Sequence, residues 1–341
     1  MRSALLLAPR RIEIRDVEMP PVAEREVLIR PARAGICGSD VSFYLGHRQP
    51  PFLPFTIGHE LVGQVVSVGP GVTKLAAGQR VVVEPNYTCG RCRFCREGRG
   101  NICPNKQSLG VSIQGCFAEY VKAPEEFTWP VPDTISDLNA ASIEPQAVSL
   151  HALLQSGARA GDTVAVVGCG VVGLLLAHAA VARGIRVLAR DQFPAKLDMA
   201  VALGAIADDQ PDPTARWLDE GVTIVFECAG ATATVERSIA SAPRGSTVVL
   251  LGLSSTPAAF VPLRVVREGI RIEPSLIYDH PADFEATIRL VADGTLSPSR
   301  IVTDNVPFES LGHALETAST GRAGKIHVVF SHSERSVTDI R

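Results

Sequence analysis

The stretch that decides the fold is Val164-Ala165-Val166-Val167-Gly168-Cys169-Gly170-Val171-Val172-Gly173. Its first four residues form a continuous apolar run, which is typical of a strand buried on both faces of a parallel sheet. Three glycines follow at a GxGxxG spacing, and a helix is expected over about 172–183. Alone, this motif is weak evidence for a dinucleotide-binding turn. Here a strand signal and a helix signal flank it, which favours a dinucleotide-binding turn over an ordinary glycine-rich loop.

The segments after this stretch alternate between strands and helices. Strands are expected at 186–189, 224–227 and 246–251 because these runs are apolar and rich in β-branched residues. Such alternation predicts an α/β fold with a doubly wound parallel sheet. Upstream of residue 150 the chain instead has short β-branched segments separated by glycine and proline, which indicates an irregular antiparallel β-domain.

Two domains are therefore expected, which is also more typical of 341 residues than one domain. We assign the cofactor domain to 149–285. We assign the β-rich domain to 1–148 together with 286–341, with a strand over 325–330 that returns to it.

The residues around the glycines predict the cofactor. Five residues of the turn should contact it: Gly168, Gly170, Val171, Val172 and Gly173. An acidic residue that bonds the adenosine ribose should follow, and Asp191 lies 18 residues after the last glycine. This favours NAD over NADP, because a 2′-phosphate would meet a carboxylate. Arg190 and Arg186 leave NADP open, since an arginine can accommodate that phosphate.

Four cysteines crowd into one short segment upstream. They are Cys89, Cys92, Cys95 and Cys103. Thiolates at this spacing can converge on one tetrahedral ion, and zinc closed by four sulfurs is the structural form of that site. The arginines around them would also suit nucleic acid, but the segment lacks histidine and has no stacking aromatic besides Phe94. We interpret the segment, about 86–104, as a structural-zinc lobe with a solvated basic face.

Composition excludes several classes of partner. The formal net charge is −3, so no overall basic field attracts nucleic acid or an anionic membrane. The N-terminal apolar run is too short for a secretory signal, and the longest apolar stretch is interrupted by glycines. Without an export signal, clustered thiols indicate metal rather than disulfides. The expected location is the cytoplasm.

Three blocks of sequence resemble a known family. They are Gly35-Ile36-Cys37-Gly38-Ser39-Asp40, Gly58-His59-Glu60-Leu61-Val62-Gly63 and the four-cysteine lobe. Together with the glycine motif, they make the chain similar to the zinc-dependent medium-chain dehydrogenases, the alcohol and polyol dehydrogenase superfamily. The likeness is greatest to the sorbitol, butanediol, threonine and sugar-acid dehydrogenase branch. It implies a GroES-like β-rich catalytic domain and a Rossmann cofactor domain.

The resemblance implies a second, open zinc site. Its ligands would be Cys37, His59 and Glu144, with Glu60 as a labile fourth ligand or a neighbouring group. Asp40 is placed to accept the other N–H of the histidine. Ser39 would pass the substrate proton onward, although it could instead cap a helix. The distal relay histidine of alcohol dehydrogenases falls at Ser42, so the proton must leave by another route, for example through Glu60 and water.

Further implications concern the cofactor, the subunits and the reaction. The strand ends at Cys228, Leu251 and Gly252 resemble cofactor-adjacent turns of the family. Two zinc ions per subunit and a homodimer or homotetramer are implied. The expected reaction is hydride transfer from a secondary alcohol, polyol or sugar acid to NAD, which gives the ketone. Two alternatives stay open: an NADP-dependent aldehyde or ketone reductase, and a non-catalytic nucleotide or redox sensor with the same fold.

Overall fold

The computed structural model describes residues 1–331, and the chain divides into two compact units. Unit 1 comprises Met1–Glu144 and the chain from Val302 onward, whereas unit 2 comprises Pro145–Ile301. These limits differ from our domain boundaries at 148/149 and 285/286. The second limit falls later because helix α10 (Ala282–Ala292) belongs to unit 2. Residues 332–341, which we assigned to the β-rich domain, lie outside the described part.

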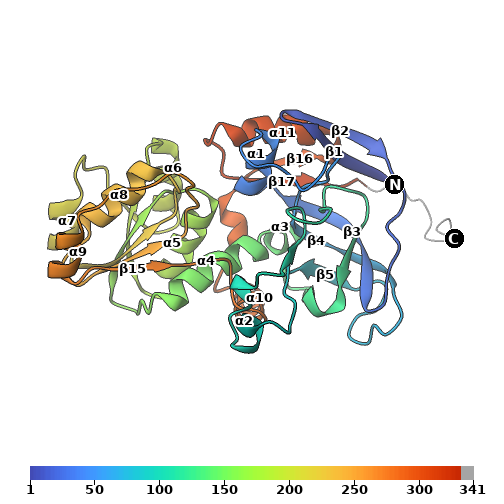
Figure 1. Cartoon of the computed structure of the whole chain (residues 1–341), viewed down its shortest axis with the longest axis horizontal. Helices are drawn as coiled ribbons and strands as arrows, with labels where there is room; N and C mark the ends of the chain where they lie inside the picture. The colour runs from blue at the N-terminus through green and yellow to red at the C-terminus, as the bar shows by residue number, and fades with distance from the viewer. Residues whose placement is uncertain (332–341) are drawn as a thin grey trace. The chain divides into compact units, whose positions relative to one another are not determined.

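A seven-stranded sheet forms the centre of unit 1 (Figure 1). Strand β3 (Glu26–Gly35) pairs antiparallel with β4 (Glu60–Val68) and also with β17 (Lys325–Val329). At the end of β3, Gly35 lies opposite Glu60 in β4 and opposite His327 in β17. The other strands are β16 (Val302–Pro307), β5 (Arg80–Val83), β8 (Val121–Pro124) and β9 (Thr128–Pro130). The predicted return of the last strand to the β-rich unit is therefore seen.

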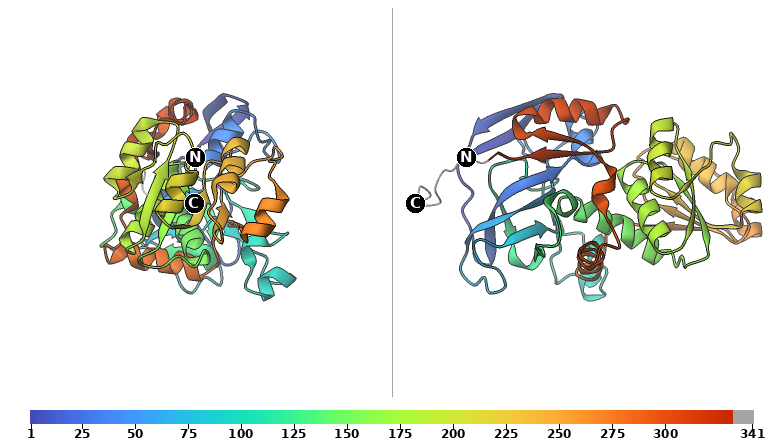
Figure 2. Two further views of the ribbon diagram at one scale, coloured as in Figure 1. Left: turned by 90° about the vertical axis from the view of Figure 1, so that its left-hand side faces the viewer. Right: turned by 180° about the vertical axis from the view of Figure 1, so that it is seen from behind.

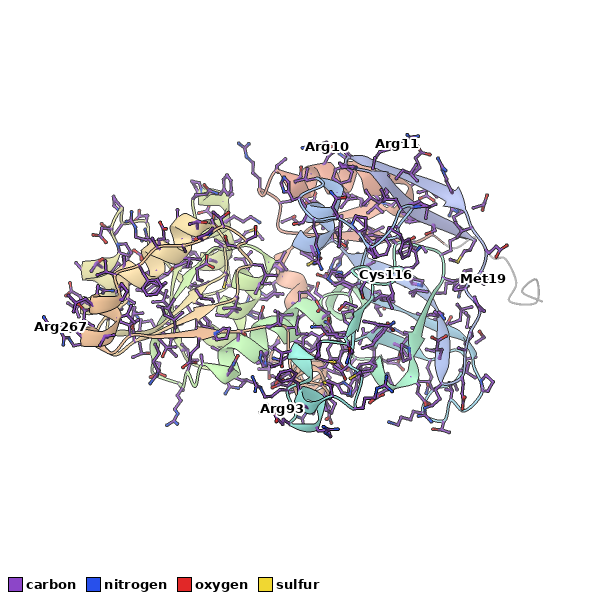
Figure 3. The ribbon with its side chains drawn as sticks, viewed as in Figure 1. Arg10, Arg11, Met19, Arg93, Cys116 and Arg267 are labelled. Atoms are coloured by element: carbon purple, nitrogen blue, oxygen red, sulfur yellow. The ribbon has the colours of Figure 1, made fainter. Side chains whose placement is uncertain are left out.

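Smaller elements surround this sheet. Two pairs of strands stand apart from it: β1 (Arg2–Ala8) with β2 (Arg11–Asp16), and β6 (Asn86–Tyr87) with β7 (Gln107–Ser108). The helices are α1 (Gly38–Tyr44), α2 (Arg93–Arg96), α3 (Asp137–Ala140) and α11 (Leu311–Ser319). One apolar core, which includes Phe55, Phe117 and Cys116, contains residues of β1, β6, α1 and α11 as well as of the sheet; Figure 3 labels Cys116.

Unit 2 contains a six-stranded sheet in which every pairing is parallel. In spatial order its strands are β12 (Ile206–Ala207), β11 (Arg186–Arg190), β10 (Thr163–Val167), β13 (Val222–Glu227), β14 (Thr247–Leu250) and β15 (Arg271–Pro274). Helices flank the sheet on both sides in the end-on view (Figure 2). The strand order reverses direction beside β10, so the predicted doubly wound α/β fold is confirmed.

The helices of unit 2 connect these strands. They are α4 (Ile143–Gln155), which begins in unit 1, α5 (Val171–Ala182), α6 (Pro194–Ala202), α7 (Thr214–Asp219), α8 (Thr232–Ser241), α9 (Pro262–Glu268) and α10. Helix α5 is apolar on almost every side and is buried along most of its length, as expected for a helix inside an α/β layer. No helix within residues 1–331 has both the length and the apolar character of a membrane span.

Candidate functional site

The ends of two adjacent strands bring three potential metal ligands together in unit 1. Strand β3 ends at Gly35, and Cys37 follows immediately before helix α1. Strand β4 begins at Glu60, directly after His59. One ligand atom from each of Cys37, His59 and Glu60 lies within 4.8 Å of the others. The strand register, which places Gly35 opposite Glu60, is therefore what assembles the cluster.

Two features hold the loop that carries His59. Gly58 has φ +95°, and a Cβ there would lie 2.7 Å from the ring of Phe117, so a side chain is excluded. The buried carboxylate of Asp40 accepts hydrogen bonds from the backbone N–H of Cys37 and from that of Gly58, both at 2.9 Å. Asp40 thus fixes the backbone beside two of the ligands at once.

Asp40 does not act on His59 in the way that we expected. Its Oδ1 lies 3.9 Å from His59 Nδ1, which is too far for a hydrogen bond, and Nδ1 has no hydrogen-bond partner. The reason is geometric, because the two backbone hydrogen bonds hold the carboxylate at this distance from the ring. The interaction with the imidazole is electrostatic rather than a hydrogen bond.

The surroundings of His59 favour a cation. Burial alone would lower the pKa of His59, but the charge and hydrogen bond of Cys37 and the charges of Asp40 and Glu144 raise it to about 10. An environment that stabilises a protonated imidazole to this extent also stabilises a metal ion that replaces the proton. Burial raises the pKa of Asp40, which shows how little water reaches this region.

Glu144, Ser39 and Ser42 were also predicted to take part in the site or its proton transfer, and each lies in a different environment. Glu144 is buried near the start of α4 and is close enough to His59 to influence its pKa, but the three-residue cluster of described residues does not include it. The hydroxyl of Ser39 is buried without a hydrogen-bond partner, so it does not cap helix α1, whose N-cap is Cys37. Ser42 also lies on α1, where it supplies no group that titrates near neutral pH.

Sequence reasoning missed two basic residues of β17 that approach this cluster. Lys325 Nζ pairs with the Glu60 carboxylate, and His327 Nε2 lies 2.9 Å from the hydroxyl of Ser142, just before Glu144. Both side chains have no exposed surface. Burial, followed by the charge of Lys325, lowers the pKa of His327 to about 2, so the ring is neutral. The sequence offered one indication of this, because Lys325 is a charged residue at the first position of an otherwise largely apolar strand.

The four cysteines of the lobe also converge. Ligand atoms of Cys89, Cys92, Cys95 and Cys103 lie within 4.8 Å of one another. The sulfur of Cys92 is 3.4 Å from that of Cys95 and 3.8 Å from that of Cys103. Sulfurs that bind one zinc ion tetrahedrally are about 3.8 Å apart, so the four residues fit this metal.

The lobe contains one thiol with a lowered pKa and has a solvated basic rim. Backbone N–H groups of Arg91 and Cys92 lower the pKa of the Cys89 thiol to about 6, which favours the thiolate that a metal needs. The Arg93 side chain is 77% exposed and pairs with Glu97 at 2.6 Å (Figure 3). This arrangement matches the solvated face that we expected.

In unit 2, the glycine turn between β10 and α5 leaves almost no space for side chains. A Cβ on Gly173 would lie 1.9 Å from the carbonyl oxygen of Gly168, so the helix can approach the strand only through glycine. Gly168 has φ +96°, and a Cβ there would lie 2.6 Å from Ala229 N. Gly170 is different, because nothing lies within 4 Å of its Cβ position. The space where a side chain of residue 170 would lie is open, and the close approach of a pyrophosphate requires such space.

The residues that follow β11 are already hydrogen-bonded within the protein. Asp191 accepts from Cys169 N at 2.7 Å and from Phe193 N at 2.9 Å. Arg190 pairs with buried Asp208 at 2.9 Å and donates to Gln210 O at 2.6 Å. The charge of the Arg190 guanidinium is therefore paired and its position is fixed, so it is less suited to bind a 2′-phosphate.

The turns after β13 and β14 are both hydrogen-bonded to Glu227, a buried residue whose role the sequence did not reveal. Glu227 accepts from Ala229 N and Gly230 N, each at 3.0 Å, while its carbonyl accepts from Leu251 N and Gly252 N at 2.9 Å. These bonds fix the turns that contain Cys228, Leu251 and Gly252 at the carboxyl edge of the sheet. This edge is where open α/β sheets bind their ligands.

Comparison with known proteins agrees with this geometry. Residues 23–133 match the alcohol dehydrogenase GroES-like domain, and residues 171–293 match the zinc-binding dehydrogenase family. The chain belongs to the zinc-type medium-chain alcohol and polyol dehydrogenases, a family of oxidoreductases.

Curated relatives align along almost the whole chain. Sorbitol dehydrogenase of Bacillus subtilis is 33% identical over 332 residues, which cover 93% of each chain. L-threonine 3-dehydrogenase of Bacillus licheniformis is 32% identical over 92% of this chain and 94% of its own.

Two similar solved structures contain different nucleotides. An alcohol dehydrogenase of Escherichia coli CFT073 complexed with NADH superposes with a TM-score of 0.90 at 28% identity, covering 97% of this chain and 99% of that one. A zinc-binding dehydrogenase of Sinorhizobium meliloti 1021 bound to NADP gives 0.87 at 31% identity, covering 96% and 98%.

The glycine turn gives a prediction with a built-in control. Gly173→Ala should lower the free energy of unfolding by about 1–3 kcal/mol, because its Cβ overlaps the Gly168 carbonyl. Gly170→Ala should leave that free energy within about 0.5 kcal/mol of wild type, yet weaken nucleotide binding. Chemical denaturation and calorimetric titration with NADH measure both quantities. Equal stability losses in the two variants would contradict this interpretation of the turn.

Proposed function

We propose that this chain is a zinc-dependent dehydrogenase that oxidises a secondary alcohol, a polyol or a sugar acid with NAD. The observation that carries the proposal is the buried cluster of Cys37, His59 and Glu60, with Glu144 close to the imidazole. This donor set of thiolate, imidazole and carboxylate suits zinc. The names of the curated relatives, sorbitol and threonine dehydrogenases, support small hydroxylated substrates.

The cluster fits a metal ion because some of its own atoms are unpaired. His59 Nδ1 and Glu60 Oε1 are buried without hydrogen-bond partners, and such orphaned groups require a further partner. A zinc ion held by Cys37, His59 and Glu144, with Glu60 as an exchangeable ligand, would supply Lewis acidity toward the alcohol oxygen. The four-cysteine lobe would hold a second, structural ion.

The protein's own residues have three tasks in this reaction. We propose that Ser39 takes the hydroxyl proton of the substrate and passes its own proton on, and its buried Oγ without a hydrogen-bond partner supports this role. Asp40 keeps the backbone beside Cys37 and His59 in place through its two hydrogen bonds. Burial of the cluster excludes water, which strengthens every electrostatic interaction in it. Because Ser42 cannot relay a proton further, we propose that Glu60 and water carry it out.

NAD is the proposed cofactor because Asp191 presents a carboxylate after β11 and Arg190 is occupied by Asp208. NADP remains the rival, since the similar Sinorhizobium meliloti structure is bound to NADP. An NADP-dependent aldehyde or ketone reductase would use the same glycine turn and the same metal cluster.

We further propose that the chain associates with itself through unit 2. Helix α9 buries none of its residues, and Val261, Leu263 and Val266 on or beside it are at least 62% exposed. Leu253 and Phe260 are exposed as well. Strand β15 is an open edge of the sheet, and an open edge can pair with the same edge of another copy. A second copy would cover both this edge and the exposed side chains. The eight free cysteines of the described chain suit a reducing compartment such as the cytoplasm.

Metal analysis tests the central proposal. Wild-type protein should contain two zinc ions per chain. Cys37→Ser should lose one ion and reduce turnover by about 100-fold or more, because losing an electrostatic catalytic group commonly lowers kcat by this amount. Cys95→Ser should lose the other ion and lower thermal stability. Cys116→Ala, a buried thiol outside both clusters, should keep both ions. Full zinc content in Cys37→Ser, or no turnover by wild type on any diol, polyol or aldonic acid, would favour the sensor alternative.

Kinetics test the cofactor. Wild type should show a higher kcat/KM with NAD than with NADP. Asp191→Ala should reduce the NAD value by about 10-fold or more, because a hydrogen bond to a charged group is lost. Asp198→Ala, an exposed carboxylate on α6, serves as the matched control and should change neither value. A wild-type preference for NADP would establish the reductase alternative.

The exposed apolar side chains on α9 predict how assembly responds to charge. Val266→Lys should lower the mass measured by light scattering during size-exclusion chromatography, because an ammonium group cannot be buried cheaply in an apolar interface. Leu218→Lys, on α7 and 65% exposed in wild type, is the control and should keep the wild-type mass. A monomeric wild type would refute the proposed association.

A further inference from the structure

Lys325 occupies an unusual environment at the start of β17. Its side chain has no exposed surface, and lysine is almost never fully buried unless its charge is paired. The ammonium pairs with the carboxylate of Glu60, which is 1% exposed, and donates a hydrogen bond to Ile36 O at 2.8 Å. The pair thus lies inside unit 1, and its backbone acceptor, Ile36, directly precedes Cys37 along the chain.

The sheet reserves space for this pair. Gly35 lies beside both partners, and a Cβ there would be 2.0 Å from Glu60 Oε2 and 2.7 Å from Lys325 Cε. Any side chain at position 35 would separate the lysine from the carboxylate. Because Gly35 is also the residue opposite Glu60 in the strand register, the missing side chain lets charged groups of β4 and β17 meet across β3.

Glu60 has a second potential partner at the cluster with Cys37 and His59. One of its oxygens belongs to the cluster with Cys37 and His59, and Oε1 has no hydrogen-bond partner. The carboxylate is therefore shared between a fixed ammonium and the position where the three ligands converge. The ammonium and a metal ion would compete for the same anion.

We propose that Lys325 is a positioning residue that retains Glu60 beside the metal and prevents the carboxylate from binding the ion permanently, so that a ligand position stays available to the substrate oxygen. This inference rests on the proposed function, because it assumes a metal at the cluster. Without the lysine, Glu60 would be a buried anion whose remaining cationic partner is the metal. The metal would then be held longer and the substrate would compete less well for it.

The alternative is an ordinary structural ion pair that joins β4 to β17. The two roles differ in what they change. A structural pair affects the free energy of unfolding when it is broken, but leaves metal exchange unchanged. A positioning lysine changes metal exchange and the KM for the alcohol, and it does so only while the carboxylate of Glu60 is present.

The test compares four variants of the zinc-loaded, full-length protein. Lys325→Met removes the charge at similar side-chain length, and Lys325→Arg retains it. Glu60→Gln removes the carboxylate, and the double variant Glu60→Gln/Lys325→Met removes both charges. The readouts are the rate at which a chelator removes zinc from the cluster, the absorption spectrum of the cobalt-substituted protein, and KM separately from kcat.

Lys325→Met should release zinc about 10-fold more slowly than wild type and raise KM for the alcohol, with an altered cobalt spectrum. Lys325→Arg should restore the wild-type release rate. The double variant should release zinc at the same rate as Glu60→Gln alone. Unchanged or faster release in Lys325→Met, or a further change in the double variant, would overturn the inference.

Two controls keep the test decisive. If Lys325→Met does not fold, Lys325→Gln takes its place, because its amide can still donate to Ile36 O while the charge is removed. Zinc release as fast as in wild type would then overturn the inference. Failure of the proposed function is seen separately, since Cys37→Ser would then retain as much zinc as wild type whatever happens at Lys325.

Discussion

The close packing of three strands at Gly35 is the constraint on which the cluster of Cys37, His59 and Glu60 depends. The last residue of β3 has Glu60 on one side and β17 on the other, and it has no side chain to hold them apart. This contact brings a carboxylate, an imidazole and a thiol to one buried place, together with a lysine. Several charges are thereby removed from water, which is costly unless each finds an opposite charge or a metal. Asp40 and Lys325 satisfy part of that requirement from within the protein.

The parts of the structure that follow from local pattern could be predicted from the sequence. The strand over 164–167 could be predicted because a continuous apolar run directly before a glycine turn is typical of a buried parallel strand, and it appears as β10. The four-cysteine cluster could be predicted because its ligands lie close along the chain. The grouping of Cys37 with His59 came from family resemblance, since no local spacing brings together residues from two different strands.

The parts that depend on tertiary register could not be predicted. Lys325 looks in sequence like the solvated end of a strand, and only its position beside Gly35 shows that it is buried. Glu227 looks like the last residue of a strand, whereas its carboxylate holds the turn after β13 and its carbonyl holds the turn after β14. The expected hydrogen bond from His59 to Asp40 is also absent, because two backbone N–H groups hold the aspartate carboxylate 3.9 Å from His59 Nδ1. Such a fixed separation cannot be read from a linear pattern.

The position of β17 in the sheet of unit 1 has a consequence for biosynthesis. This strand pairs directly with β3, although nearly three hundred residues separate the two along the chain. A nascent polypeptide on the ribosome can complete the parallel sheet of unit 2 before β17 has been made, while the edge of β3 that receives β17 stays open. The cluster of Cys37, His59 and Glu60 therefore acquires its ion-pair partner, Lys325, only when translation is almost finished. In a chain truncated before β17, the buried Glu60 carboxylate would lack this partner.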